Sequence, residues 1–486
     1  MSRCRFDTWG YAQGLIFITQ SYIIMKTYDL IIIGSGGGSK LRAATEVWKT
    51  VAIIEKSELG GTCLNRGCIP SKMLIYPADL MTHMREDAEK FGISGVSNPK
   101  IDFEKLMKRV NKEISENSES IEPMYKKDSL VTLYKWHGKF VSDTVVEVNG
   151  EHLTAEHIYI ATGSTATVPP IEWLADTPYF TSVEALKNTE QPQKMIVIGG
   201  GYIATELGHF YGATGTDMHF LVRSEMLKNE DKDIRTEFAR DFGKRYNLHY
   251  WVNPTKVSFK NNTFFVTVED KEWQESIMES DSLFVATGVA PNTDGLGLEN
   301  TSITMNKKGY IEVDEHLETA ASWVYALWDV VWNYLFRHSV NFEGEYLAWQ
   351  HYLGDAKSPI KYPPVPHAVF SYPQIAGVGV TEDQLIKEWQ ELWKDYVVGI
   401  NHYKNSAMGM AMIPEVWMVK IIAEKATGKM IWAHIVWEKA SDIIHMLIIY
   451  VSQGATVRQM LSEIIFIHPA LSENIRNAGR KIITQI

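Results

Sequence analysis

The sequence predicts an α/β protein with two Rossmann-like folds, the second inserted into the first, and an α+β domain at its C-terminus. An apolar strand that ends in a glycine turn occurs at residues 28–38 and again at 195–201, and each leads into a helical stretch and a second strand. The tripeptide Ala-Thr-Gly also follows an apolar strand twice, at 161–163 and 286–288. From about residue 364, short strands followed by two helices indicate an antiparallel sheet.

The composition limits the function classes. A chain of 486 residues suggests about three domains of 100–200 residues each. Its net charge of −11, with no basic run, argues against nucleic acid or an anionic membrane as a partner. No apolar stretch is long enough to span a bilayer. Three cysteines cannot staple a chain of this length, so we expect a cytoplasmic protein rather than a secreted disulfide scaffold.

The first residues do not read as a targeting signal. Gln20 and Ser21 interrupt the apolar run near the start, and no small-residue cleavage site follows. A strand begins shortly afterwards, at Tyr28. We therefore expect residues 1–25 to be a non-native extension, with the native start at Met25.

The first glycine turn predicts a dinucleotide site. Gly34 and Gly36 follow the first strand, Ser39 takes the third position of the motif, and Glu55 ends the next strand. Such glycines let the backbone approach a pyrophosphate at a helix N-terminus, while the acid holds a ribose hydroxyl. The alternative is a glycine-rich loop without a ligand.

The second glycine turn predicts a nicotinamide nucleotide. Gly199, Gly201 and Ala204 form the same pattern, and the following strand ends at Val222, directly before Arg223. An NAD-binding fold usually has an acid at that place, whereas an arginine suits the 2′-phosphate of NADP. We therefore expect NADP rather than NAD; the alternative is a solvated arginine at a strand end.

Two cysteines follow the first nucleotide unit directly. Cys63 and Cys68 lie in the segment GGTCLNRGCIPSK at 60–72. Their spacing is not the two-residue gap of a zinc knuckle or a thioredoxin-type motif, and we expect no metal site. On a helix they could be bridged if the first turn is distorted. A redox-active disulfide beside the cofactor is favoured over buried packing of two thiols.

The chain resembles the class I pyridine nucleotide–disulfide oxidoreductases, a family that includes dihydrolipoamide dehydrogenase, mycothione reductase and mercuric reductase. The resemblance extends from Met25 onward, and it is carried by GGTCLNRGCIPSK, VIGGGYIATELG, VATGVAPNTDGLGLEN, YALWDV, PHAVFSYPQIAGVGVTE and IHPALSE. It implies FAD in the first fold, NAD(P) in the second and a homodimer. The expected domains are FAD-binding at 26–165 and 286–355, NAD(P)-binding at 166–285 and dimerisation at 362–486.

The resemblance also implies roles for single residues. Cys68 would contact the flavin and Cys63 would exchange with substrate, while Lys72 and Glu206 would pair beside the flavin N5. Asp329 would contact the flavin side chain. Further positions expected to line the cofactors are Thr62, Gly138, Thr162, Gly163 and Gly288.

A histidine and a carboxylate lie near the C-terminus. His468 precedes a proline, and Glu473 follows five residues later. Thiol–disulfide exchange needs a base because the thiolate is the attacking form, and a histidine oriented by a carboxylate can hold that proton near neutral pH. The resemblance implies that His468 acts on the cysteines of the other subunit.

The leading expectation is a dihydrolipoamide dehydrogenase, which passes electrons between NAD(P)H, FAD, the Cys63–Cys68 disulfide and a lipoyl group or another small dithiol or disulfide. Arg223 keeps open an NADPH-dependent reductase of a low-molecular-weight disulfide, as in mycothione or glutathione reductase. Mercury reduction is a minor alternative, because no cysteine pair ends the chain. A non-catalytic relative whose FAD site is blocked by Trp328 is the remaining one.

Tryptophan is unusually frequent, with 15 residues. Nine of them stand at positions where the family that this chain resembles has glycine. Such positions call for left-handed backbone or close approach to a cofactor, which an indole opposes. We interpret them as glycine codons, because some bacteria reassign UGA to glycine and a code with UGA as tryptophan would print Trp. The nine are Trp48, Trp136, Trp173, Trp323, Trp328, Trp332, Trp417, Trp432 and Trp437.

Overall fold

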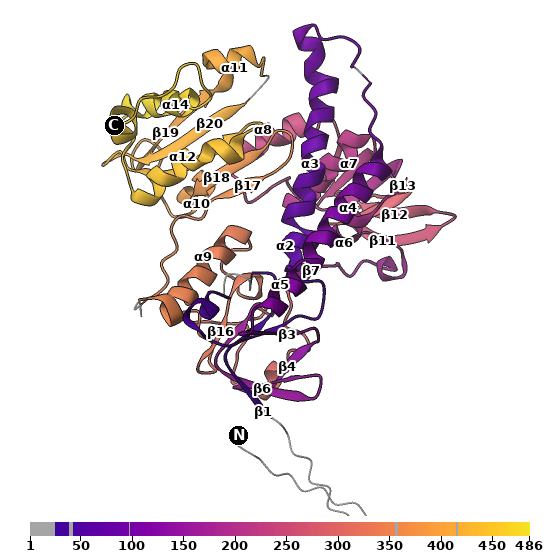
Figure 1. Cartoon of the computed structure of the whole chain (residues 1–486). Coiled ribbons are helices and arrows are strands. Elements are labelled where there is room, and N and C mark those ends of the chain that lie inside the picture. Colours follow the sequence, from indigo (N-terminus) through magenta and orange to yellow (C-terminus); the bar gives the residue numbers. More distant parts are fainter. Residues whose placement is uncertain (1–24, 38–41, 97, 355–357, 415–416) are drawn as a thin grey trace, which may run out of the picture. The chain divides into compact units, whose positions relative to one another are not determined.

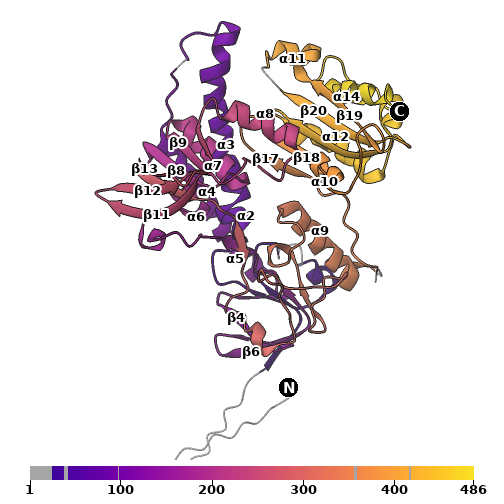
Figure 2. The same ribbon diagram turned by 180° about the vertical axis from the view of Figure 1, so that it is seen from behind.

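The computed structural model (Figures 1 and 2) describes residues 25–37, 42–96, 98–354, 358–414 and 417–486. The expected extension, apart from Met25, and Ser39 lie outside the described residues. The chain forms two compact units. One runs to Ile69 and continues with Lys112–Thr165 and Val289–Lys361; the other contains Pro70–Asn111, Ala166–Gly288 and Tyr362–Ile486.

The first unit is built on a seven-stranded sheet in the order β3-β2-β1-β6-β5-β4, and the seventh strand, β16, pairs with the end of β6. The neighbours β3, β2, β1, β6 and β16 are parallel, and β4 and β5 form an antiparallel extension. The second half of β1 (LIII) and the whole of β2 (VAII) are aliphatic runs because both faces of these central strands are buried. The strands are β1 (Met25–Ile33), β2 (Val51–Ile54), β3 (Val131–Tyr134), β4 (Gly138–Ser142), β5 (Val145–Val148), β6 (Glu151–Ile160) and β16 (Val324–Ala326).

The first unit begins with the predicted order of strand, glycine turn, helix and strand, with one difference in the helix. The stretch after the first glycine turn is described only as a short 3₁₀ helix, η1 (Arg42–Val47), rather than a full α-helix. The other helices that begin in the first unit are α2 (Gly61–Arg66), α3 (Cys68–Thr82), α5 (Ile121–Lys127) and α9 (Arg337–Ala348), and α4 (Phe103–Glu119) enters it from the second unit.

The second unit contains the second predicted nucleotide fold. Its parallel sheet has the order β10-β9-β8-β14, and α7 begins directly after the glycine turn. A three-stranded antiparallel sheet lies between β10 and β14 in the sequence. The elements are β8 (Lys194–Ile198), α7 (Tyr202–Thr214), β9 (Asp217–Val222), α8 (Lys232–Phe242), β10 (Asn247–Tyr250), β11 (Asn253–Lys260), β12 (Thr263–Glu269), β13 (Glu275–Ser280) and β14 (Ser282–Val285).

The C-terminal part of this unit is the expected α+β domain. Its five strands form an antiparallel sheet in the order β17-β18-β21-β20-β19, and α12 and α14 pack on it (Figure 1). Alternate residues of β20 and β21 form an apolar core with these helices. The elements are β17 (His367–Val369), β18 (Ile375–Gly379), α10 (Glu382–Lys387), β19 (Tyr396–His402), β20 (Met418–Glu424), β21 (Met430–Val436), α12 (Ala440–Gln453), α13 (Val457–Ser462) and α14 (Glu473–Ile483).

No helix among the described residues combines the length and the apolar character that a bilayer crossing requires.

Candidate redox-active site

The two cysteines lie on either side of a helix break. Cys63 is in α2, Cys68 begins α3, and both side chains are partly exposed. Gly67 ends α2, and a Cβ atom at this residue would lie only 2.9 Å from the carbonyl oxygen of Thr62. Glycine at 67 therefore lets the end of α2 fold back closely on the backbone of Cys63.

The segment that carries the cysteines lies against the first glycine turn. A Cβ atom at Gly61 would lie 2.3 Å from the Cα of Gly36, and Gly61 has a φ of +64°. Gly34 approaches the carbonyl oxygen of Ala161 just as closely, with a Cβ atom placed 2.3 Å from it. These contacts exclude any larger side chain. Through them the predicted pyrophosphate loop packs against both the end of β6 and the cysteine segment.

Glu55 closes the loop through both of its carboxylate oxygens. One of its carboxylate oxygens accepts hydrogen bonds from the backbone N–H and the hydroxyl of Ser35, at 2.9 and 2.8 Å. The other accepts from the backbone N–H of Ser57 at 2.8 Å. The carboxylate is thus fixed at the end of β2, where the motif places the ribose-binding acid.

Trp328 lies directly on the glycine loop. A Cβ atom at Gly37 would lie 2.0 Å from the Trp328 ring, which is 4% exposed, and Trp328 has a φ of +76°. The indole N–H donates to the carbonyl of Val340 at 2.9 Å. The backbone of the loop fits a dinucleotide pyrophosphate, but this side chain does not, because it covers the loop surface that the phosphates would approach.

The other predicted cofactor contacts of the first fold lie on several elements, and Asp329 is one of them. Its carboxylate accepts a hydrogen bond from the Ser164 hydroxyl at 2.8 Å, and burial raises the pKa of this group. Thr162 and Gly163 are held by Asn292, whose side-chain amide donates to the Thr162 carbonyl at 2.9 Å. Gly138 begins β4 against Ile54, and Thr62 is exposed on α2.

Lys72 and Glu206 form the expected ion pair. The Lys72 ammonium lies 2.6 Å from a carboxylate oxygen of Glu206, whose other oxygen accepts from the backbone N–H of Phe370 at 2.9 Å. The same ammonium lies 4.2 Å from the centre of the Phe370 ring. Burial raises the pKa of Glu206, and the Lys72 charge opposes that shift. Three distant segments of the chain thereby fix one lysine.

The second glycine turn is closely packed at Gly199 and open at Gly201. Gly199 has a φ of +136°, and a Cβ atom there would lie 2.3 Å from the carbonyl oxygen of Ala286. Gly201 is the N-cap of α7, and open space faces it. Gly288, with a φ of +129°, is equally open. Arg223 follows β9 and is exposed, so its guanidinium is accessible to a ligand.

The C-terminal dyad is assembled. His468 Nδ1 lies 3.0 Å from each carboxylate oxygen of Glu473, and Arg476 donates to the same carboxylate at 2.6 Å. The Glu473 side chain is 4% exposed and that of His468 is 68% exposed. These contacts lower the pKa of Glu473, with the hydrogen bond to His468 as the largest cause. An ionised carboxylate thus fixes one ring nitrogen, and the ring is presented to the outside.

Eight tryptophans have left-handed backbone, which side chains other than glycine rarely adopt. Four of them belong to the nine identified in the sequence, namely Trp48, Trp173, Trp323 and Trp328. Another four were not identified there: Trp251, Trp273, Trp389 and Trp393. Trp432 and Trp437 have ordinary φ values, but each buries an indole N–H without a hydrogen-bond acceptor among the described residues. Trp136, Trp332 and Trp417 show neither feature, and the glycine interpretation stays a prediction at every position.

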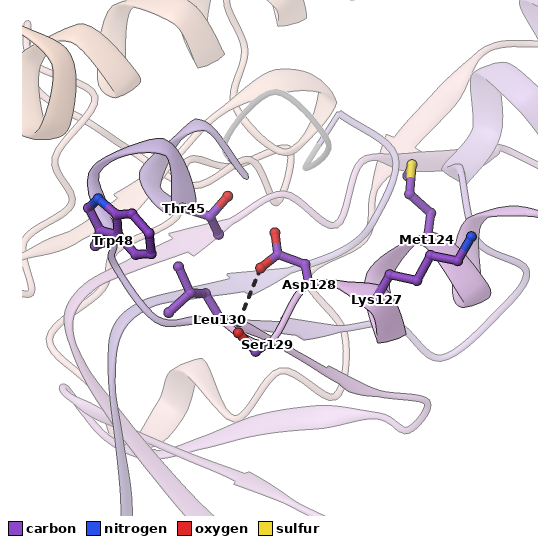
Figure 3. Close-up of a pocket in the computed structure, with 7 residues that line it drawn as sticks. All are labelled: Thr45, Trp48, Met124, Lys127, Asp128, Ser129 and Leu130. Atoms are coloured by element: carbon purple, nitrogen blue, oxygen red, sulfur yellow. Dashed lines mark hydrogen bonds between the residues drawn. The ribbon is translucent and has the colours of Figure 1, made fainter.

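A pocket of about 490 Å³ lies beside Trp48 (Figure 3). Trp48 and Thr45 stand at one end, and Met124 and Lys127 stand at the other. The remaining lining residues are Asp128, Ser129 and Leu130. The Trp48 side chain is 84% exposed and its φ is +62°. Because this indole forms one wall, the pocket depends on a residue interpreted here as glycine, and it gives no evidence for a ligand.

Two dinucleotide turns, a cysteine pair on the first fold and a terminal His–Glu pair define a flavin-dependent disulfide oxidoreductase. Residues 28–351 match the family described as pyridine nucleotide-disulphide oxidoreductase, and residues 365–479 match the dimerisation domain of that family. The chain belongs to this family. Its members are FAD-dependent, with NAD(P)H as the electron donor.

The relatives point to several activities. The mitochondrial dihydrolipoyl dehydrogenase of Pisum sativum is 33% identical over 464 residues, covering 93% of this chain and 90% of its own. The mycothione reductase of Mycobacterium tuberculosis is 32% identical over 472 residues, covering 93% and 99%. A solved structure of the HOCl-induced flavoprotein disulfide reductase RclA from Escherichia coli has a TM-score of 0.81 at 25% identity, covering 93% and 99%.

Sequence reasoning missed two residues near the predicted sites. Arg337, at the start of α9, donates to the carbonyl of Gly36 at 3.0 Å and thereby braces the glycine loop. Phe370 contacts both members of the Lys72–Glu206 pair. Neither residue stands at a fixed distance from a glycine turn or a cysteine, so no spacing pattern could have indicated them.

Proposed function

We propose that this chain is an FAD-dependent NAD(P)H:disulfide oxidoreductase that exchanges electrons with a lipoyl-type dithiol through Cys63 and Cys68, as a homodimer. The observation that carries the proposal is the cysteine pair across the Gly67 break, held against the first glycine turn by the Gly36–Gly61 contact. The similarity to dihydrolipoyl dehydrogenase supports the lipoyl group as substrate.

The residues of the chain divide the work. Cys63 forms the mixed disulfide with substrate, and Cys68 takes over the electrons as a thiolate. His468, oriented by the ionised Glu473, receives the substrate proton at its outer ring nitrogen. Bound FAD would supply the redox step between the nicotinamide and the disulfide. The Lys72 ammonium, fixed by Glu206, provides positive charge one helical turn after Cys68.

Trp328 must be reconciled with this proposal. The indole on Gly37 covers the loop that the cofactor phosphates need, so we propose that the native residue at 328 is glycine. If tryptophan is native there, a protein without FAD becomes the better description. A flavin absorption spectrum of protein purified from its native host separates the two cases.

A second candidate function rests on Arg223. Its exposed guanidinium at the end of β9 suits a 2′-phosphate, which favours NADPH and the reduction of a low-molecular-weight disulfide. The similarity to mycothione reductase supports this alternative.

The deciding experiment compares rates for lipoamide, glutathione disulfide and mycothione disulfide, each with NADH and with NADPH. A highest kcat/KM for lipoamide supports the first proposal. A highest kcat/KM for mycothione or glutathione disulfide with NADPH replaces it with the second.

A further inference from the structure

Three potential metal ligands meet in the second unit. Glu230, His367 and His434 each offer one ligand atom, and these atoms all lie within 4.8 Å of one another. Glu230 is 1% exposed and His434 is fully buried. Glu230 directly precedes the N-cap residue of α8, and the two histidines come from β17 and β21. The sequence separates them too widely for a spacing motif.

The register of the terminal sheet explains how the two histidines meet. His367 pairs with Gly377 on β18, and Gly377 pairs with His434 on β21, so the three residues form one row across the sheet. A Cβ atom at Gly377 would lie 2.5 Å from Nε2 of His434 and 2.7 Å from Cε1 of His367. The missing side chain therefore leaves the space into which both rings lean, and their centres are 5.3 Å apart.

Glu230 is oriented toward these rings. The Tyr202 hydroxyl donates to its Oε1 at 2.5 Å. Its Oε2 lies 2.9 Å from Nε2 of His367 and 3.6 Å from Nδ1 of His434. In proteins, a carboxylate that binds a metal through one oxygen is commonly held in place by a hydrogen bond to its other oxygen.

The burial of His434 is not accounted for by hydrogen bonds of its ring. Both of its ring nitrogens are buried, and neither makes a hydrogen bond to a residue that the structure describes. A buried polar group left without a partner destabilises the native state, and coordination of a cation would remove that cost.

Lys420, the next residue of the same row, does not use up the Glu230 charge. Its ammonium lies 3.0 Å from Asp231, 2.6 Å from Asp233 and 2.6 Å from Glu382. The carboxylates of Asp231, Asp233 and Glu382 thus balance the charge of Lys420. The Glu230 carboxylate remains beside the two imidazoles.

We propose that Glu230, His367 and His434 bind a divalent first-row transition-metal ion, with Zn²⁺ as the ion to which we commit. Two imidazole nitrogens and one carboxylate oxygen are a common zinc ligand set, and a water molecule can complete the tetrahedron. The ion would link the start of α8 in the nucleotide fold to β17 and β21 of the terminal sheet. The role of the ion would be structural, and this proposal does not depend on the proposed redox function.

The test is zinc binding by the full-length protein after removal of metals with a chelator. Zinc sulfate is added, the protein is desalted, and bound zinc is measured by atomic absorption. The double variant C63S/C68S is the background, because thiolates also bind zinc. One zinc ion per chain is expected to remain in that variant. Loss of all bound zinc in C63S/C68S would overturn the proposal.

Single substitutions locate the site. H434Q and E230Q are expected to weaken zinc binding by about 100-fold or more, since each removes one of three protein ligands. Y202F keeps all three ligands and removes only the orienting hydrogen bond, so a loss of about 10–100-fold is expected. The matched control is H445Q, an exposed histidine on α12, which should bind zinc like the parent. Equal affinity in H434Q, E230Q and the parent contradicts the site.

Thermal unfolding gives a readout that does not depend on activity. Zinc is expected to raise the Tm of the parent and of H445Q, and to leave the Tm of E230Q unchanged, because only a ligand that binds the native state stabilises it. If H434Q does not fold, E230Q and Y202F still decide the matter. An equal rise of Tm in all variants means that zinc binds elsewhere, and the proposal fails.

Discussion

Nδ1 of His468 lies 3.0 Å from both carboxylate oxygens of Glu473, so a nearly buried carboxylate holds a largely exposed imidazole from one side. The carboxylate accepts from Nδ1, which leaves the other ring nitrogen as the acceptor that faces outward. A histidine so oriented can take a thiol proton repeatedly without turning its ring.

Glu473→Gln should slow thiol–disulfide exchange while FAD remains bound. The amide cannot stabilise the imidazolium that forms when His468 takes a proton, so kcat should fall by about 100-fold. Stopped-flow reduction of the enzyme disulfide by dihydrolipoamide measures this step. Glu463→Gln, an exposed glutamate ten residues earlier, is the control and should react like the parent. Unchanged kinetics in Glu473→Gln would show that the carboxylate has no part in the exchange.

The same pair makes stability depend on pH. The pKa of Glu473 is lowered in the native state, chiefly by the hydrogen bond with His468. Its ionised form therefore stabilises the native state above the ordinary pKa, and this stabilisation is lost as the pH falls through the lowered value. Denaturant unfolding should show Glu473→Gln as less stable than the parent at neutral pH. The difference should shrink in acid, and a difference that grows in acid would contradict the assignment.

The two cysteines should respond differently to substitution. Cys68→Ser should keep FAD but lose the long-wavelength charge-transfer band on two-electron reduction. Cys63→Ser should retain that band, because Cys68 remains as a thiolate beside the ring. Anaerobic titration with dithionite, followed by absorption spectroscopy, measures both. The opposite pattern would exchange the roles of the two cysteines.

Arg223 should decide the nicotinamide preference. The parent should have a higher kcat/KM with NADPH than with NADH, and Arg223→Glu should narrow or reverse the ratio by about tenfold or more, because a charge-assisted pair to the 2′-phosphate is lost. Steady-state kinetics with both nucleotides measure the ratio. Arg240→Ala, an exposed arginine on α8, should leave it unchanged. An unaltered ratio in Arg223→Glu would leave Arg223 as a solvated residue.

Most of the sites that the sequence predicted are local ones; the Lys72–Glu206 pair, 134 residues apart, was expected only from the family resemblance. The cysteine segment, the two glycine turns and the His468–Glu473 pair each fit within a few turns of chain, where spacing determines geometry. The Glu230–His367–His434 cluster depends instead on the register of β17, β18 and β21 and on the empty place at Gly377. No pattern within one segment encodes that register, so only the tertiary structure could reveal it.

The tryptophans divide in the same way. Trp48, Trp173, Trp323 and Trp328 were identified because a family motif gave the expected glycine, and all four have left-handed backbone. The turns at Trp251, Trp273, Trp389 and Trp393 carry no motif, so only their φ values of 61–70° reveal them. A tryptophan held in this region costs about 1–3 kcal/mol. Eight such residues together rival the whole stability of a typical domain, about 5–15 kcal/mol.

The gene provides the decisive measurement. Codons 251, 273, 389 and 393 should read UGA, as should the nine codons predicted from the sequence. Trp349 is the internal control: it has ordinary helical backbone with a φ of −65° and is not among the nine positions where the family has glycine, so its codon should read UGG. A protein with glycine at all thirteen positions should be soluble and yellow, whereas the printed sequence should fold poorly and bind little FAD, because Trp328 covers Gly37. If the four new codons read UGG, the left-handed tryptophans are genuine, and the strain they store becomes a property of a divergent, flavin-free relative.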